Sequence, residues 1–230
     1  ETVFALGDLR FYGRENAEER GVTRFYERVY GREAAEDDPF ALSLEESESL
    51  RRMYLEAEHE DGYLRDQSVF GDGISIEDDM AVLVRYQNRA VMSYHLTAYS
   101  PWEGYRVAFN GTRGRLEYEV HENSYVSGSS QDTNLPEIRD AQEVVVDEPA
   151  SILIRPLWGK PLRVDVATGE GGHGGGDRRM LDAIFIGGED DPLGRAADHV
   201  AGAMSILTGI AANQSFATGL PVQVSSLVRF

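Results

Sequence analysis

The chain has 230 residues, of which 41% are hydrophobic and 27% are charged, the composition of an ordinary globular protein. Its formal net charge of -18 argues against a nucleic-acid binder, which needs a basic face to displace counterions from phosphates, and against binding to an anionic membrane surface. Cysteine is absent, which excludes disulfides and thiolate chemistry and fits a reducing, cytoplasmic location.

The N-terminal part of the chain is predicted to form one strand and two helices. Residues 2–6 are an apolar run typical of a strand. Within residues 13–39, apolar side chains recur at i, i+3, i+4 and i+7, which predicts a helix with one apolar face: Val22, Phe25, Tyr26 and Val29. Ser43 precedes Glu46 in a capping-box pattern, which predicts a second helix with its own apolar face: Leu50, Met53, Tyr54 and Ala57.

From residue 80 the apolar period changes to two, which predicts antiparallel hairpins. Residues 80–86 alternate and reverse at Asn88 and Arg89, where asparagine tolerates a positive φ. The returning strand, 90–99, places His95 and Tyr99 on the face opposite Tyr94. A second hairpin spans 105–120 around Asn110-Gly111-Thr112-Arg113-Gly114, because Asn-Gly between alternating runs is typical of a tight turn.

The C-terminal part is predicted to contain short strands and two helices. Residues 127–139 are polar and predict an exposed loop, and strands are expected at 143–146, 151–155 and 162–166. The glycine-rich run 169–176 precedes a helix that Asp177 caps and that ends at Phe185.

The last predicted helix begins after its cap Asp198 and ends at Gly219, and a strand follows over 222–228. The apolar part of this helix is too short to cross a bilayer. The first strand has no charged leader before it. We therefore expect neither a membrane anchor nor a signal peptide.

Together these elements predict an α+β fold, with one large, mostly antiparallel, open-faced sheet and helices on one face. We expect residues 1–230 to form a single domain. The uncovered face of such a sheet meets solvent or a partner, so a homodimer or tetramer through the open sheet is expected.

Two regions carry candidate chemistry. His173 lies in a glycine-rich run before a helix, where backbone can approach a ligand and an imidazole can donate, accept or move a proton. The alternative is an incidental histidine in a flexible linker. The second region combines aromatic and polar groups that suit a sugar-like ligand, although a half-exposed hairpin end would look the same: His95, Tyr99, Trp102 and Glu103.

Other polar residues give weaker signals. His59 and His121 lie among acids and are predicted to be solvated. The histidines are far apart, and adjacent acids such as Asp78 and Asp79 point in different directions, so we assign no metal. No G-x-S-x-G elbow is present, and no catalytic residue is assigned.

Several motifs in the same order resemble the C-terminal domain of the Gfo/Idh/MocA oxidoreductases, over nearly the whole chain. The motifs are Val-Phe-Gly-Asp at 69–72, Ile-Ser-Ile-Glu-Asp at 74–78, Glu-Gly-Tyr-Arg-Val-Ala-Phe-Asn-Gly-Thr-Arg-Gly-Arg-Leu-Glu at 103–117, Gly-His-Gly-Gly-Gly-Asp at 172–177 and Gly-Ile-Ala-Ala-Asn-Gln-Ser at 209–215. The resemblance implies a substrate-binding and oligomerisation domain on a large open sheet. Family members hold NAD or NADP in an N-terminal Rossmann domain and act on sugars, inositols or related polyols.

The chain departs from the whole-family pattern in three ways. It has no glycine-rich dinucleotide fingerprint, no Glu-Lys-Pro motif and no preceding histidine-bearing helix, and its single lysine, Lys160, has another context. We therefore expect a fragment without the dinucleotide-binding domain, inactive alone and with no cofactor of its own.

Two alternatives remain open. The chain could be a non-catalytic oligomerisation module. A related branch of the superfamily uses NAD in glycoside hydrolysis and has a similar Gly-His-Gly-Gly segment, so the parent could also be an NAD-dependent glycosidase. The similarity to this branch strengthens the assignment of His173 to a substrate pocket.

Overall fold

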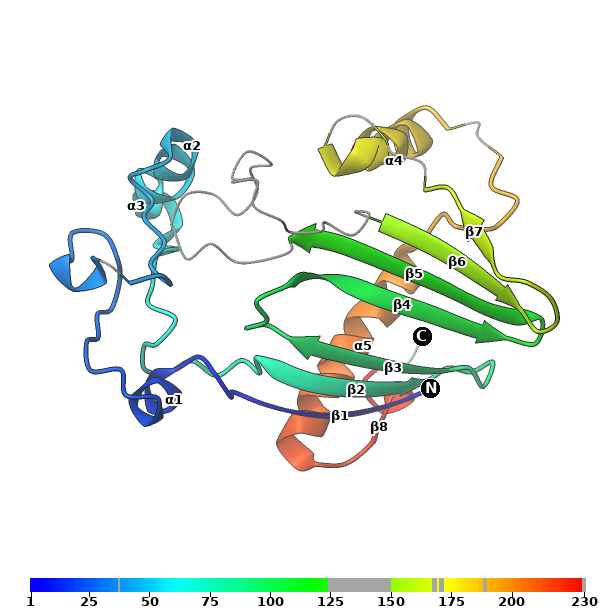
Figure 1. Ribbon diagram of the computed structural model, residues 1–230, viewed down its shortest axis with the longest axis horizontal. Coiled ribbons are helices and arrows are strands. Elements are labelled where there is room, and N and C mark those ends of the chain that lie inside the picture. Colours follow the sequence, from blue (N-terminus) through cyan, green and yellow to red (C-terminus); the bar gives the residue numbers. More distant parts are fainter. Residues whose placement is uncertain (37, 124–149, 167–168, 170–171, 188–189, 229–230) are drawn as a thin grey trace. The chain divides into compact units, whose positions relative to one another are not determined.

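The structure, a computed structural model, describes residues 1–36, 38–123, 150–166, 169, 172–187 and 190–228 (Figure 1). The described residues form two compact units. The first takes its residues from Glu1–Ser100 and Ala203–Phe230, and the second from Pro101–Tyr125 and Asp140–Gly202. No helix in the described part of the chain has the length and hydropathy needed to span a membrane.

The first unit contains a four-stranded antiparallel sheet of order β3-β2-β1-β8 (Figure 1). Its strands are β1 (Thr2–Asp8), β2 (Asp79–Arg85), β3 (Val91–Thr97) and β8 (Val222–Gln223). The predicted first strand and first hairpin are therefore confirmed. At the reversal, Arg89 and not Asn88 has the positive φ of 69°, while the side chain of Asn88 accepts a hydrogen bond from the Ala90 amide at 3.0 Å.

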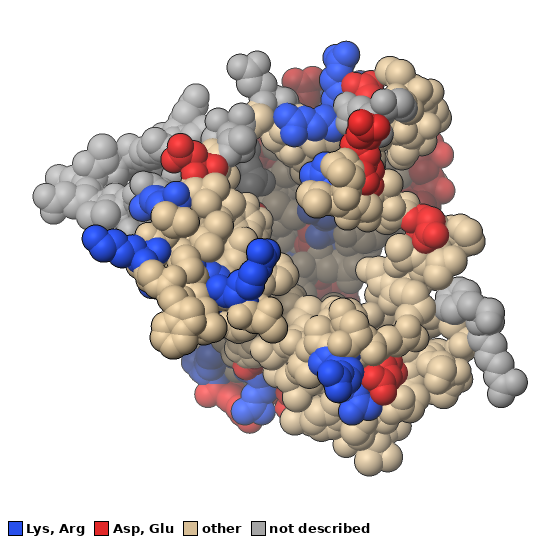
Figure 2. All heavy atoms as spheres, turned by 90° about the vertical axis from the view of Figure 1, so that its right-hand side faces the viewer, with Lys and Arg blue, Asp and Glu red and all other residues tan. Residues whose placement is uncertain are grey.

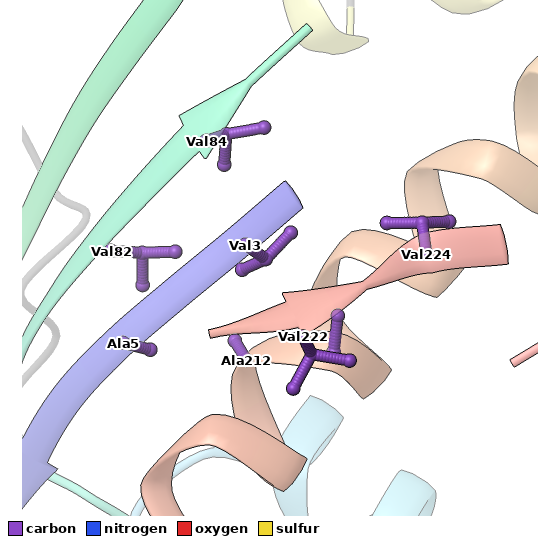
Figure 3. Close-up of a cluster of buried hydrophobic side chains, with 8 residues drawn as sticks. Val3, Ala5, Val82, Val84, Ala212, Val222 and Val224 are labelled. Atoms are coloured by element: carbon purple, nitrogen blue, oxygen red, sulfur yellow. The ribbon is translucent and has the colours of Figure 1, made fainter. Parts of the chain in front are cut away.

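One face of this sheet forms the hydrophobic core with helix α5 (His199–Thr218) (Figure 3). Val3 and Ala5 of β1 lie opposite Val84 and Val82 of β2, so alternation sends all four side chains to the same face. The buried core consists of these residues with others from α5, β8 and the turn after it: Ala211, Ala212, Val222 and Val224.

Between β1 and β2 the helical segments in the described residues are short. They are α1 (Arg14–Glu19), η1 (Glu33–Ala35), α2 (Glu48–Leu50), η2 (Arg51–Leu55) and α3 (Glu58–Asp61). The helix predicted across 22–29 is wrong, because this stretch bonds to a distant part of the chain. Val29 N donates to Asp66 O at 2.9 Å, and Ser68 N donates to Glu27 O at 2.9 Å.

The second predicted helix exists in short form, but its cap was misplaced. It begins at Glu48, and the hydroxyl of Ser47, not that of Ser43, accepts the Leu50 amide at 3.3 Å. The next turn, η2, is a π-helix, so the predicted apolar face does not continue with a regular α-helical period.

The second unit contains another four-stranded antiparallel sheet, of order β4-β5-β6-β7. Its strands are β4 (Glu103–Gly111), β5 (Gly114–Asn123), β6 (Ala150–Pro156) and β7 (Leu162–Val164). The Asn-Gly hairpin is confirmed. The antiparallel α+β fold is confirmed as well, with the strands divided between two sheets where we expected one.

The glycine-rich run and the C-terminal elements differ in detail from the prediction. The segment η3 (Gly172–Gly175) leads into helix α4 (Gly176–Phe185), whose N-cap is Gly175 in the left-handed region, so Asp177 lies in the first turn and is not the cap. Asp198 does cap α5, accepting the Ala201 amide at 2.8 Å. The predicted closing strand is limited to β8, because the chain turns into η4 (Val224–Ser226). The predicted loop 127–139 and strand 143–146 lie outside the described residues.

Candidate functional site

A carboxylate–imidazole pair lies at one end of the first sheet. His95 Nε2 is 2.9 Å from Asp79 Oδ1, and the His95 side chain is 65% exposed. His95 pairs with Ala81, whereas the neighbouring Tyr94 pairs with the core residue Val82. Alternation therefore places His95 on the face of the sheet opposite to the core and α5.

Tyr99 joins this pair through the same carboxylate. Its hydroxyl lies 3.5 Å from Asp79 Oδ2, a long contact, and its ring stacks on that of Phe11 at a centroid distance of 4.9 Å and an angle of 12°. Loss of hydration and then the negative charges of Asp79 and Asp78 raise the pKa of Tyr99 above its ordinary value. The phenol therefore remains a hydrogen-bond donor at neutral pH. We name Phe11, Asp79, His95 and Tyr99 the Asp79 cluster.

The preceding residue, Asp78, positions Phe11. Its buried carboxylate accepts three backbone amides, from Arg10 at 2.7 Å, Phe11 at 2.9 Å and Tyr12 at 2.8 Å. Burial alone would raise the pKa of Asp78, but these hydrogen bonds outweigh burial and lower the pKa below its ordinary value. The ionised Asp78 thus fixes the turn that carries Phe11 to Tyr99.

The Asp79 cluster places hydrogen-bonding groups beside an apolar ring surface. When His95 Nε2–H donates to Asp79, Nδ1 carries the lone pair and can accept a ligand hydroxyl. When both nitrogens are protonated, Nδ1 can donate instead, and Asp79 stabilises the charge. The aromatic rings add apolar contact surface beside these polar groups.

Two further predicted residues, Trp102 and Glu103, belong to the second unit. Trp102 Nε1 donates to His121 Nδ1 at 2.9 Å, and the two rings meet edge to face. Glu103 opens β4 opposite Asn123. The prediction that His121 is solvated is wrong, because its side chain is only 15% exposed. Trp102 is thus held by a protein partner that the sequence analysis did not assign to it.

His173 also lies in the second unit, in a strained backbone conformation. It is one of two non-glycine residues in the described chain with a positive φ, 48°. Its side chain is 85% exposed, and Nδ1 lies 2.8 Å from Asp177 Oδ2. The hydrogen bond and negative charge of Asp177 raise the pKa of His173 above its ordinary value. The candidate residues predicted from the sequence therefore belong to two units. His95 and Tyr99 lie together in the first, and Trp102, Glu103 and His173 belong to the second.

Three residues of these arrangements were not predicted from the sequence to take part in a site: Phe11, Asp79 and His121. Asp79 could have been found, because a reversal at 88–89 places it opposite Thr97, two residues from His95. Within the described ranges, no group of three His, Asp or Glu side chains is arranged to hold a metal ion.

Acidic and basic side chains are interspersed on the face of the molecule drawn in Figure 2, separated by large uncharged areas. In the second sheet, Glu117 forms ion pairs with both Arg115 and Arg155, at 2.7 and 2.9 Å. The face drawn in Figure 2 shows no broad basic surface.

Comparison with known proteins identifies the class to which this antiparallel α+β fold belongs. Residues 29–224 match the sequence model described as "Oxidoreductase family, C-terminal alpha/beta domain". The chain belongs to the Gfo/Idh/MocA oxidoreductases and corresponds to their C-terminal domain, which confirms the resemblance seen in the sequence.

Two individual proteins are similar to the chain. One, named "Putative oxidoreductase YteT", from Bacillus subtilis (strain 168), is 32% identical over 250 residues, which cover 99% of this chain and 51% of the relative. The chain thus spans about half the length of this curated relative. The other is a crystal structure of a "putative nadph-dependent oxidoreductase" from Desulfitobacterium hafniense DCB-2, with 16% identity and a TM-score of 0.45 over 68% of this chain and 40% of that one.

Proposed function

We propose that this chain is the substrate-binding domain of an NAD(P)-dependent oxidoreductase that acts on a sugar, an inositol or a related polyol. Membership of the oxidoreductase family supports the general class. The observation that carries the substrate proposal is the Asp79 cluster, in which one carboxylate contacts an exposed imidazole and a phenol beside stacked rings.

Within this proposal, each residue of the cluster has a separate task. Asp79 fixes the orientation of His95, so that Nδ1 meets a substrate hydroxyl as acceptor or donor. Tyr99 donates to a second oxygen of the substrate. Phe11, held by Asp78, supports the Tyr99 ring. A polyol offers adjacent hydroxyls for these polar groups and C–H surface for the ring.

The described residues do not fit a dinucleotide. Both sheets are antiparallel, whereas the dinucleotide cradle is built on a parallel βαβ unit. The glycine-rich start of α4 carries Asp177 in its first turn, which places negative charge where a pyrophosphate would bind. In our proposal NAD or NADP is bound mainly by another part of the whole protein, and this chain alone is inactive.

The test uses the whole protein with NAD⁺ or NADP⁺ and a panel of sugars, inositols and other polyols. We expect Asp79→Asn and His95→Gln to lower kcat/KM about 10- to 100-fold, the loss of one charge-assisted hydrogen bond. The matched control His59→Gln, an exposed histidine on α3, should leave it unchanged. Absence of turnover on the whole panel would refute the substrate class. Release of free sugar from an aryl glycoside, without net cofactor reduction, would favour a glycosidase instead.

Oligomerisation is a second proposed function, supported by one face of the second sheet. Strand alternation gathers apolar side chains on this face, and several are exposed: Tyr105, Val107, Phe109, Leu162 and Val164. We propose that a second copy of the chain covers it. Phe109→Glu should convert the dimer or tetramer to a monomer in light scattering. If light scattering shows that the unsubstituted protein is a monomer at high concentration, this proposal is contradicted.

A further inference from the structure

A chain of hydrogen bonds connects four side chains of β4, β5 and Trp102, the residue that precedes β4. Trp102 Nε1 lies 2.9 Å from His121 Nδ1, and His121 Nε2 lies 3.1 Å from Glu119 Oε1. Arg106 Nε donates to the same oxygen of Glu119 at 2.6 Å. The Arg106 guanidinium also lies 5.2 Å from the centroid of the Trp102 ring. The contacts therefore close a ring of four residues, which we name the Trp102 network.

The donor in this network fixes the protonation of the acceptor. An indole N–H can only donate, so His121 Nδ1 must accept and carries no proton. The proton of the neutral imidazole is then on Nε2, where Glu119 Oε1 accepts it. These three hydrogen bonds form together only while His121 is neutral. A second proton would place Nδ1–H against the indole N–H, and two facing donors repel each other.

Charged groups of both signs lie around His121. Glu119 on β5 lies beside the ring, and the hydrogen bond from Arg106 on β4 lowers the pKa of Glu119 and keeps it ionised. Glu122 is the next residue of β5, on the face that carries Tyr105, and Glu103 lies at the same end of β4. A protonated His121 would thus keep an ion pair with Glu119 while losing its bond to Trp102.

The indole fits closely against the strand when it is bound. His121 lies opposite Gly104 in the ladder, and a Cβ at Gly104 would approach Trp102 Cζ2 to 2.7 Å. The ring therefore occupies space that any larger residue at 104 would fill. Release of the indole would expose this part of the strand edge.

We propose that His121 is a proton-operated lock on Trp102, in which the neutral imidazole holds the indole against β5 and protonation releases it. The lock needs no ligand and is independent of the proposed enzymatic function. It makes the local structure around Trp102 depend on pH.

The test follows the Trp102 indole N–H by ¹⁵N NMR in a Trp158→Phe chain, where Trp102 is the only tryptophan. Between pH 8 and pH 5 we expect its resonance to move upfield and its exchange with solvent to accelerate. In Trp158→Phe/His121→Gln the position of the indole resonance and its exchange rate should not change with pH. The glutamine side chain does not titrate, while its oxygen can accept the indole N–H and its amide can donate to Glu119. Trp158→Phe/His95→Gln, which keeps His121, should retain the transition.

Two results would overturn the lock: an indole resonance that does not change with pH in Trp158→Phe, or one that changes equally after His121→Gln. If the His121 variant fails to fold by circular dichroism, Glu119→Gln gives an independent test. Loss of the carboxylate should move the midpoint of the transition to lower pH, and an unchanged midpoint would refute the proposed network.

Discussion

Ser215 of α5 completes the hydrogen bonding of Ala5 in β1. The Ala5 amide donates to Ser215 Oγ at 2.8 Å, and the hydroxyl donates back to Ala5 O at 3.2 Å. Both residues are fully buried. The edge strand β8 pairs only with Thr2 and Val3, so a helix side chain takes the place of a strand where β8 ends.

This relationship makes Ser215→Ala a costly substitution. It leaves a backbone N–H and a C=O without a partner inside the core, and we expect the free energy of unfolding to fall by about 1–3 kcal/mol. Urea denaturation measures the change. Ser205→Ala is the matched control, since Ser205 is exposed on the same helix, and it should change stability by less than about 0.5 kcal/mol. Equal effects of the two variants would contradict the bridging role.

Asp78 should couple stability to acid pH. Its pKa is lowered in the folded chain, so the unfolded chain binds more protons as pH falls, and the contribution of this carboxylate is lost. At pH 7 we expect Asp78→Asn to cost about 1.5–3 kcal/mol, the scale of hydrogen bonds to a charged group. This cost is complete above the unfolded pKa, near 3.9, and shrinks as pH falls through the folded pKa.

Urea denaturation of the unsubstituted chain and of Asp78→Asn, at pH 7 and at pH 3, measures both the cost of the substitution and its decrease with pH. Asp8→Asn provides the control, because the Asp8 side chain is 69% exposed and should contribute little at either pH. A stability difference between parent and Asp78→Asn that is the same at both pH values would show that the carboxylate charge is not responsible.

Local pattern was sufficient where both partners lie close in sequence. The alternation of Val82 and Val84 and the Asn110-Gly111 turn predicted two hairpins. The apolar period around Val29 predicted a helix that does not form, because the Val29 backbone bonds to Asp66. A partner 37 residues away cannot be detected from the spacing of neighbouring residues.

The candidate site follows the same rule. His95 and Tyr99 were found because they share a hairpin. Phe11 was missed, because its place beside Tyr99 depends on three hydrogen bonds from its turn to Asp78, which no spacing in the sequence reveals.

Arg28 compensates a buried charge. Its guanidinium lies 2.8 Å from Asp66 Oδ1 and also pairs with Glu58, while the Asp66 side chain is 0% exposed. Arg28→Met would leave the carboxylate of Asp66 buried without its cation, and we expect a loss of about 3–5 kcal/mol in the free energy of unfolding. Arg24→Met, at an exposed arginine, is the control and should change the free energy of unfolding by less than about 0.5 kcal/mol.

The same ion pair allows a double-variant test. In Arg28→Met/Asp66→Asn the uncompensated charge is gone, so part of the lost stability should return. If the double variant is as unstable as the sum of the two single variants, the two residues act independently and the ion-pair explanation is wrong.

Asp177 should raise the pKa of His173 in solution. The hydrogen bond and charge of Asp177 raise the pKa of His173, so Asp177→Asn should lower that pKa toward the value of a free imidazole. The titration of the His173 Cε1–H resonance by NMR measures it. Asp182→Asn, on the same helix α4 and beside Arg178, is the control and should leave the His173 titration unchanged.

The sign of the effect on stability follows from the raised pKa. The folded chain holds the His173 proton more tightly than the unfolded chain does. The pair therefore stabilises the start of α4 at pH values below the unfolded pKa, and this contribution is lost as pH rises through the folded pKa. Because His173 is exposed, the change should be seen in the local titration and in hydrogen exchange at the start of α4. An identical titration of His173 in the parent and in Asp177→Asn would mean that the contact is absent in solution.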